Sequence, residues 1–222
     1  MIKENEQGLL IVVSGPSGCG KSTLDQRIVK ENSNIVISVS DTTRSIRDGE
    51  KEGVDYNYIT KEEFEENIKN NKYLEYAIVH SNNYYGTPIE KIDEKLSKGI
   101  DVILEIDIEG ARKVKEVRQD AVFIFIMPPS MKELKRRLIT RGSETKEQVV
   151  ERFKTAYKEI NEVSKYNYVI VSNNVDESVI KMKSIITCEK CRVDRIEELY
   201  LGNQEEMIHE ILMDFENEKS EK

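Results

Sequence analysis

Short apolar runs alternate with amphipathic segments along most of this chain. Residues 9–13, 101–108 and 121–127 are rich in apolar side chains, and such runs are typical of strands buried on both faces of a parallel sheet. Between these runs, apolar residues recur every three or four positions, which is the spacing of one face of a helix. The pattern predicts an α/β fold in which helices flank a parallel sheet.

The individual elements follow from the same periodicities. Strands are expected over residues 9–13, 35–40, 56–59, 73–79, 101–108, 121–127 and 168–171. Helices are expected after residue 23, over 61–70, 89–97 and 131–140, around 111–117 and 149–163, and in two tail segments, from about 176 and around 207–215. Residues 81–87 are typical of a turn, because they contain a serine, two asparagines and a glycine.

The block from about residue 41 to 91 differs from the rest of the chain. It is richer in strands and aromatic residues, and the regular alternation of strand and helix resumes only near its end. We interpret it as an inserted substrate-binding subdomain. The chain shows no internal repeat and no low-complexity linker, and 222 residues suffice for one core with such an insertion.

Composition excludes several classes of protein. Charged residues make up 34% of the chain, the net charge is -8, and both signs are interspersed, so no large basic face for duplex nucleic acid is expected. The longest apolar run is strand-sized, and the first one is too short for a secretory signal, so neither membrane insertion nor export is expected. Three cysteines are too few for a disulfide framework, which favours a reducing, cytoplasmic location.

Two of the cysteines, Cys188 and Cys191, form a lone C-x-x-C pair. A structural zinc site usually takes four Cys or His ligands, and the only histidines are His80 and His209. We therefore favour two incidental thiols on a helix surface over a zinc site at this pair.

One stretch carries recognisable phosphate chemistry. Residues 15–22 match the pattern G-x-x-x-x-G-K-[ST], between a buried strand and a helical segment. The glycines allow a tight turn whose N–H groups face phosphates, Lys21 places a positive charge on the outer phosphates, and the Ser22 hydroxyl can coordinate Mg²⁺. The residues expected to bind the triphosphate are Gly15, Pro16, Ser17, Gly18, Cys19, Gly20, Lys21, Ser22 and Thr23.

The phosphate loop alone leaves a GTPase, an ATPase and a small-molecule kinase open. Asp107-x-x-Gly110 matches a short GTPase switch pattern, but such a short pattern occurs often by chance and no N-K-x-D guanine-reading motif occurs in the chain. We interpret Asp107 instead as the acidic residue at a strand end that faces the water shell of a bound Mg²⁺.

Further motifs narrow the choice, and together they resemble guanylate kinase. They occur in the order and at the spacing of that family, and the resemblance runs from about residue 8 to about 175. The motifs are Ser40-x-Thr-Thr-Arg44, Gly53-x-Asp-Tyr56, Leu74-Glu75, Asn83-Tyr-Tyr-Gly-Thr87, Ile106-Asp-x-x-Gly110 and Pro128-Pro-Ser130.

The resemblance implies transfer of the γ-phosphoryl group of ATP to GMP, with Mg²⁺ as cofactor. Arg44 and Arg47 would grip the GMP phosphate with forked hydrogen bonds, assisted by two tyrosine hydroxyls. Glu75 is the family position that accepts hydrogen bonds from the guanine N1–H and exocyclic amine, and two side-chain hydroxyls would bind the rest of the polar edge. The implied GMP-binding residues are Ser40, Arg44, Arg47, Tyr56, Glu75, Tyr85, Thr87, Glu105 and Asp107.

The resemblance also implies a lid that closes over ATP. Its arginines are Arg137, Arg141 and Arg152, which would stabilise charge on the transferred group and, with Lys21 and Arg44, form the implied catalytic set. Lid closure would also exclude water as a competing acceptor.

The same resemblance sets an expected organisation. It implies a phosphate-loop NTPase fold in one domain, with an inserted mixed α+β GMP-binding subdomain and a helical lid. The expected parts are a core of residues 1–40, 92–130 and 158–187, the GMP-binding subdomain 41–91, the lid 131–157 and a helical extension 188–222 that lies outside the resemblance. Use of dGMP stays open, as does the choice between monomer and homodimer.

Three residues depart from the family pattern. Ile46 stands where a proline is usual, Glu105 replaces the commoner aspartate, and Ser172 replaces a frequent asparagine near the adenine site. We expect a looser loop at Ile46 and an otherwise intact site. Two alternatives remain: a catalytically inactive guanylate-kinase-like domain that binds phosphopeptides, and a phosphoribosyl-bisphosphate kinase, which would not need Glu75 as a guanine reader.

Overall fold

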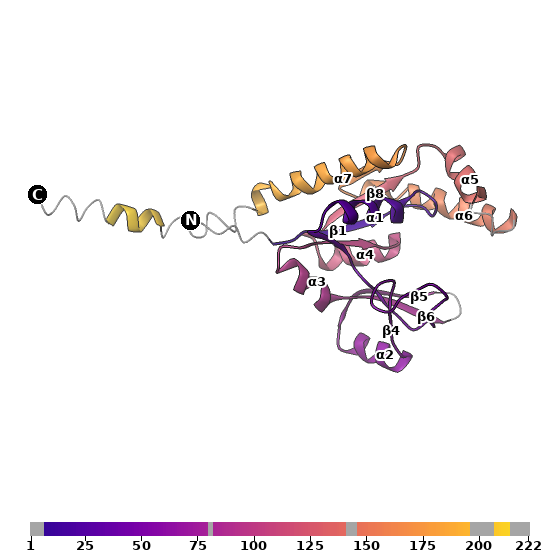
Figure 1. The fold of residues 1–222 in the computed structure, drawn as a ribbon, viewed down its shortest axis with the longest axis horizontal. Coiled ribbons are helices and arrows are strands. Elements are labelled where there is room, and N and C mark those ends of the chain that lie inside the picture. The colour runs from indigo at the N-terminus through magenta and orange to yellow at the C-terminus, as the bar shows by residue number, and fades with distance from the viewer. Residues whose placement is uncertain (1–6, 80–81, 141–145, 196–206, 214–222) are drawn as a thin grey trace, which may run out of the picture.

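The fold is built on a five-stranded parallel sheet. A computed structural model describes residues 7–79, 82–140, 146–195 and 207–213 (Figure 1). All neighbouring strands of the main sheet run parallel. In sheet order they are β2 (Ile35–Ile37), β7 (Asp101–Glu105), β1 (Leu10–Ser14), β8 (Val122–Met127) and β9 (Tyr168–Val171).

Helices cover both faces of this sheet, which confirms the α/β fold. One face packs on α1 (Lys21–Glu31) and α7 (Val175–Lys190), and the other on α3 (Ile89–Leu96) and α4 (Ile108–Val117). Side chains alternate along β1, so that Ile11 and Val13 join the first cluster and Leu10 and Val12 the second. Because both faces are buried, the strand carries a continuous apolar run.

A second, four-stranded sheet is inserted between β2 and α3. It lies beneath α3 and α4 in Figure 1, on the side of the molecule opposite α7. The pair β5–β6 is antiparallel, and α2 (Lys61–Lys69) buries Phe64 against the tyrosine rings of this sheet. In order, the strands are β4 (Asn57–Tyr58), β3 (Asp41–Thr42), β6 (Asn83–Pro88) and β5 (Tyr73–Val79).

The turn expected over residues 81–87 is wrong, because most of this segment is strand β6. It pairs with β5 on one side and β3 on the other, with Tyr85 opposite both Ala77 and Thr42. Tyrosine and threonine favour strands, and pairing on both sides satisfies the backbone of the segment. The turn is confined to its start, where Asn82 has a positive φ of 66°.

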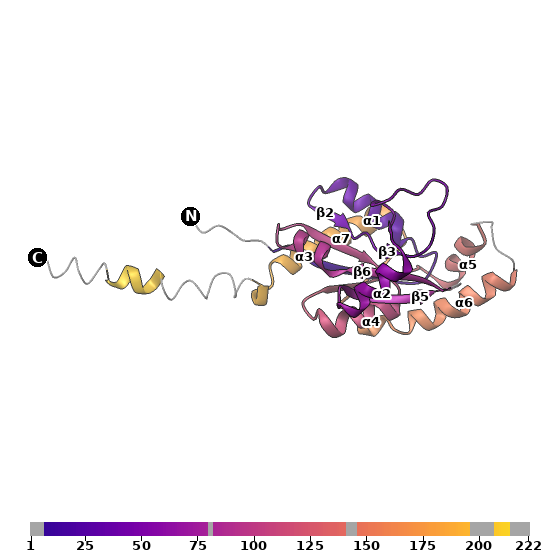
Figure 2. The same cartoon turned by 90° about the horizontal axis from the view of Figure 1, so that it is seen from below.

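Two further helices form a separate unit at one end of the molecule. They are α5 (Met131–Thr140) and α6 (Lys146–Ile160), and a short 3-10 helix, η1 (Val163–Lys165), follows (Figures 1 and 2). Leu134, Leu138 and Ala156 form their small core. A final helical segment, 207–213, exposes all its side chains, and Phe215, expected in the same helix, lies outside the described residues. No described helix is long and apolar enough to cross a membrane.

Candidate active site

The predicted phosphate loop connects β1 to α1, and its backbone requires glycine. Gly15 has a φ of +147°, and a Cβ there would lie 2.3 Å from the carbonyl oxygen of Ile126 on the neighbouring strand β8. Gly20, the residue before α1, has a φ of +98°. No other residue type fits at Gly15 without displacing β8, so the sharp turn is fixed by the sequence.

Lys21 and Ser22 begin α1, and both side chains turn to the edge where the parallel strands end. The Lys21 Nζ donates to the carbonyl oxygens of Gly15, at 2.6 Å, and Pro16, at 3.3 Å. The Ser22 hydroxyl donates to Glu105 Oε1 at 2.9 Å. The last residue of β7 is thereby tied directly to the phosphate loop.

Asp107 follows β7 by two residues and serves as the N-cap of α4. Its Oδ1 accepts a hydrogen bond of 2.7 Å from the N–H of Gly110. One carboxylate oxygen therefore fixes the start of α4. The side chain stays exposed, at the same sheet edge as the phosphate loop.

Arg44 follows β3 of the second sheet by two residues and lies among aromatic rings. Its guanidinium carbon is 5.4 Å from the ring centroid of Tyr56 and 5.8 Å from that of Tyr58. Its Nε donates to the Tyr85 hydroxyl at 3.2 Å. Tyr56 and Tyr85 pack edge to face with their centroids 5.7 Å apart, so three residues of the predicted GMP site are brought together.

The other predicted GMP-phosphate ligand, Arg47, has an exposed side chain on the loop that follows Arg44. Ser40 immediately precedes β3, and its carbonyl oxygen accepts from the N–H of Asn57 at 2.9 Å. Both residues flank the Arg44 cluster. Ile46, on the same loop as Arg47, is half exposed.

Glu75 and Thr87 are direct partners across β5 and β6. The buried Thr87 hydroxyl donates to Glu75 Oε1 at 2.6 Å. Burial raises the pKa of Glu75, and the Thr87 hydrogen bond opposes that rise. A Cβ at Gly110 would lie 3.3 Å from Glu75 Oε2, so the missing side chain lets α4 pack against this carboxylate.

Of the three predicted lid arginines, Arg137 contacts the phosphate loop. Its guanidinium donates to the carbonyl oxygen of Cys19 in the phosphate loop, at 3.2 Å, and to Ser172, whose Oγ lies at 3.1 Å and whose carbonyl oxygen lies at 2.9 Å. Ser172 Oγ also donates to Cys19 O at 2.7 Å. Arg152 is exposed on α6, and Arg141 lies outside the described residues.

The comparisons with known proteins agree with this geometry. A family model described as guanylate kinase matches residues 7–189, which is most of the chain. The chain belongs to the guanylate kinase family. It is 54% identical to a guanylate kinase of Clostridium perfringens (strain SM101 / Type A) over 96% of this chain and 98% of the relative, and 57% identical to that of Clostridium tetani over 94% of this chain and 100% of the relative.

A solved guanylate kinase structure is also similar. The crystal structure of guanylate kinase from Anaplasma phagocytophilum is 38% identical, with a TM-score of 0.68 over 86% of this chain and 90% of that one. This likeness confirms the phosphate-loop NTPase fold with its second, mixed sheet.

Two carboxylates beside the phosphate loop of this guanylate kinase family member were not predicted. Asp25, one turn into α1, is fully buried, and neither of its oxygens has a hydrogen-bond partner among the described residues. Burial, and secondly Glu105, raise its pKa well above the usual value, while Lys21 opposes the rise. Burial also raises the pKa of Glu159 on α6, against the attraction of Lys21.

Glu50 is a third carboxylate that sequence reasoning missed. It accepts two hydrogen bonds from the Arg44 guanidinium, at 2.8 and 3.0 Å. The hydroxyl of Tyr58 and the N–H of Arg47 also donate to it, at 2.7 and 2.9 Å. Arg44, followed by Tyr58, lowers the pKa of Glu50 to about 2. The only signal in the sequence is an acidic residue in the loop that follows the two arginines.

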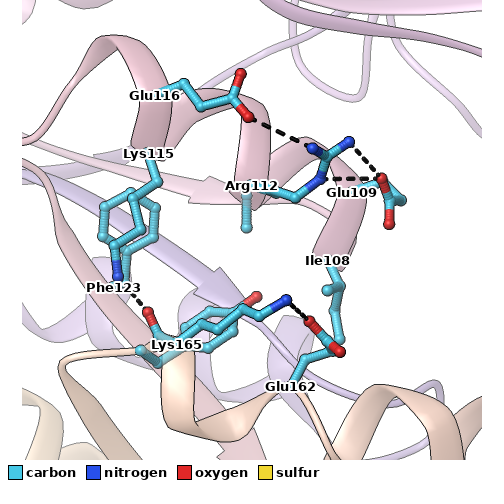
Figure 3. A pocket seen from close by; sticks show the side chains of 10 residues that line it. Ile108, Glu109, Arg112, Lys115, Glu116, Phe123, Glu162 and Lys165 are labelled. Carbon is cyan, nitrogen blue, oxygen red and sulfur yellow. Dashed lines mark hydrogen bonds and ion pairs between the residues drawn. The ribbon is translucent and has the colours of Figure 1, made fainter.

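A cavity of about 410 Å³ lies beside α4, and no predicted site residue lines it (Figure 3). Figure 3 shows Arg112 turned toward Glu109 and Glu116, with the ion-pair distances being 3.1 and 3.4 Å. Lys115 lies over the ring of Phe123, 5.3 Å from its centroid. Arg112 at the rim of the cavity is thus paired with two rim carboxylates. No residue of the phosphate loop lines the cavity.

The C-x-x-C pair lies at the end of α7. Cys188 and Cys191 are free and exposed, as expected for thiols on a helix surface. Among the described residues, no group of three or more His, Cys, Asp or Glu side chains could hold a metal ion.

Proposed function

We propose that this chain transfers the γ-phosphoryl group of ATP to GMP, producing ADP and GDP. One structural observation carries the proposal in addition to family membership. The segment from Glu105 to Gly110 touches both halves of the site, because Glu105 accepts from Ser22 of the phosphate loop and Gly110 packs on Glu75. The donor and acceptor sites therefore share one short connection.

The donor half would be the phosphate loop, Gly15 to Thr23. Its backbone N–H groups and Lys21 would hold the ATP phosphates, as the loop glycines and the start of α1 allow. Mg²⁺ fits this donor set, because it prefers oxygen ligands and keeps several waters and phosphate oxygens. Ser22 would hold the ion directly and Asp107 through water, and the bound ion would neutralise charge on the phosphates.

The acceptor half would lie on the second sheet. Arg44, Arg47, Tyr56 and Tyr85 would bind the GMP phosphate, since they offer cationic and hydroxyl donors around one place. Because the GMP phosphate is a dianion, these cationic and hydroxyl donors around one place would bind it selectively.

The base would be read by Glu75, with Ser40 and Thr87 at its other polar atoms. An ionised Glu75 accepts from the guanine N1–H and exocyclic amine, whereas adenine offers no donor at N1. Thr87 donates to one Glu75 oxygen and so orients the carboxylate. Glu105 and Asp107 would complete the acceptor site at the edge it shares with the phosphate loop.

The lid arginines Arg137, Arg141 and Arg152 would stabilise the charge that spreads over the transferred group. Arg137 donates to the carbonyl oxygens of Cys19 and Ser172, so its guanidinium would lie beside donor phosphates bound at the loop. Phosphoryl transfer depends on alignment and charge neutralisation, so these residues need no covalent role.

A variant of Glu75 tests the assignment. Glu75→Ala should raise the KM for GMP by roughly 10-fold or more and reduce the preference for GMP over AMP, because a charge-assisted pair of hydrogen bonds is lost. ATP binding should not change. A coupled assay of ADP release measures the KM for GMP, the rate with AMP and the KM for ATP. Loss of ATP binding in this variant would refute the role given to Glu75.

The wild-type chain in the same assay tests the function itself. ADP release should depend on GMP and be weak with AMP or UMP. Absence of GMP-dependent turnover would instead favour an inactive domain of the guanylate-kinase-like type.

A further inference from the structure

Most N–H donors of the Arg44 guanidinium are hydrogen-bonded to other residues of the chain. Its Nε donates to Tyr85, one Nη1 hydrogen to the carbonyl oxygen of Ser45 and the other to Glu50 Oε2, and Nη2 donates to Glu50 Oε1. An arginine has five N–H donors, so four are engaged, and one Nη2 hydrogen has no acceptor in the part of the chain that the structure describes. Arg44 therefore cannot offer a two-pronged fork to phosphate while Glu50 stays in place.

Glu50 is itself strongly held. Besides Arg44, it accepts from the Tyr58 hydroxyl at 2.7 Å and from the Arg47 N–H at 2.9 Å. The Arg44 and Glu50 side chains are only 9% and 21% exposed. Releasing Glu50 would break four hydrogen bonds and leave a largely buried guanidinium without its counter-ion, which is unfavourable.

The same contacts orient a neighbouring hydroxyl. Tyr85 accepts from Arg44 Nε, so its own O–H hydrogen points elsewhere and is ready to donate. Arg44 and Tyr85 thus present one donor each in a fixed relation. The rings of Tyr56 and Tyr58, 5.4 and 5.8 Å from the guanidinium, limit its rotation.

We propose that Glu50 is a positioning residue for the acceptor site: it stays bound to Arg44 during the reaction and fixes one Arg44 N–H and the Tyr85 O–H as paired donors to the phosphate of GMP. The inference rests on the proposed function, because it assumes that the Arg44 cluster receives that phosphate. Glu50 does not touch the substrate and acts through Arg44.

If Glu50 acted only through its charge, its removal would strengthen GMP binding, whereas loss of a positioning residue would weaken it. Glu50→Gln leaves Arg44 and Arg47 without a neighbouring anion, so a site that worked only by net charge would bind the GMP dianion more tightly. In the positioning account, glutamine offers one acceptor oxygen and an NH₂ group that cannot pair with a guanidinium, so Arg44 loses its alignment. The two accounts therefore differ in the sign of the change.

The experiment measures GMP binding by calorimetry without ATP, and steady-state kinetics with both substrates. Glu50→Gln should weaken GMP binding and raise the KM for GMP on the order of 10-fold, the loss expected for one charge-assisted hydrogen-bond pair. The KM for ATP and the affinity for guanosine, which lacks the phosphate, should not change. Glu50→Asp, which keeps the carboxylate, should recover part of the lost affinity.

A matched control lies two residues away on the same loop. Glu52 accepts from the backbone N–H of Tyr58 at 3.0 Å and does not contact Arg44, so Glu52→Gln should leave GMP binding unchanged. In an Arg44→Ala background, Glu50→Gln should cause no further loss, because its effect passes through Arg44.

Several results would overturn the inference. Unchanged or tighter GMP binding by Glu50→Gln would show that Glu50 is dispensable or competes with phosphate, and equal weakening of guanosine would show a general structural role. If Glu50→Gln does not fold, Tyr58→Phe, which removes one anchor of Glu50, should weaken GMP binding in the same direction, and no change would count against the proposal. A wild-type chain that binds GMP without turnover would contradict the proposed function, and the GMP-binding measurements on the Glu50 variants would then separately decide whether Glu50 positions Arg44 for the phosphate.

Discussion

At the scale of single residues, Asp25 is the least expected feature of the phosphate-loop helix. It is fully buried, and neither oxygen has a hydrogen-bond partner among the described residues. A buried carboxylate in this state is costly to ionise, so the folded chain holds the proton more tightly than the unfolded chain does. Asp25 therefore opposes folding increasingly as the pH rises above the unfolded pKa, about 3.9.

Replacing Asp25 should thus stabilise the chain in a pH-dependent way. The advantage of Asp25→Asn over the wild type should be small near pH 4 and grow by up to about 1.4 kcal/mol per pH unit until the raised folded pKa is reached. Urea unfolding of both chains at pH 5, 6 and 7 measures it. If the difference in the free energy of unfolding between the two chains did not change from pH 5 to pH 7, Asp25 would be ionised and stabilised in the folded state.

Site residues divide into those that sequence can reveal and those that it cannot. Lys21, Arg44 and Glu75 belong to motifs, so their positions follow from pattern and resemblance. Glu50 and Asp25 belong to no such pattern here, because their importance depends on which side chains the fold brings near them. The contacts of Glu50 and the burial of Asp25 are seen only in the structure.

At the scale of elements, the prediction from periodicity was best where tertiary context and local pattern agree. β5 (Tyr73–Val79), α5 (Met131–Thr140) and β9 (Tyr168–Val171) have the predicted bounds. β7 ends at Glu105, earlier than predicted, because Asp107 caps α4 and the chain turns there. β6 was missed because pairing on both sides outweighs turn-forming residues.

The end of α7 is attached to β9 through a buried carboxylate. Glu189 is 2% exposed, and it accepts from the Tyr168 hydroxyl at 2.5 Å and pairs with Arg195 at 3.1 Å. The charge of Glu189 is therefore satisfied by several donors from β9 and from the residues after α7.

Removing the Tyr168 hydroxyl should weaken this attachment. Tyr168→Phe should lower the free energy of unfolding by about 1–2 kcal/mol, because a buried carboxylate loses one donor. Chemical denaturation measures the change, and Tyr157→Phe on the exposed face of α6 is the matched control. If both variants were equally stable, the bond would contribute nothing to the stability of the folded chain.

At the scale of the whole molecule, the two sheets would supply the two halves of the proposed site. The parallel sheet presents the phosphate loop, and the second sheet presents the arginine and tyrosine cluster, with residues 105–110 between them. The apolar runs predicted the parallel sheet, which the structure confirms, whereas the residues that family motifs assign to the two halves stay a prediction. How Arg137 docks on Cys19 and Ser172 could not be predicted, because it joins residues far apart in sequence.

We propose that the γ-phosphoryl group of ATP bound at the phosphate loop is transferred to GMP bound at the Arg44 cluster of the second sheet. To test this transfer, the chain is incubated with Mg²⁺, GMP and ATP that carries a label at its γ-phosphate, and the position of the label is followed. The label should appear in the β-phosphate of GDP at the same rate as ADP is formed. Label that stays in ATP, or that appears only as inorganic phosphate, would contradict the proposed transfer.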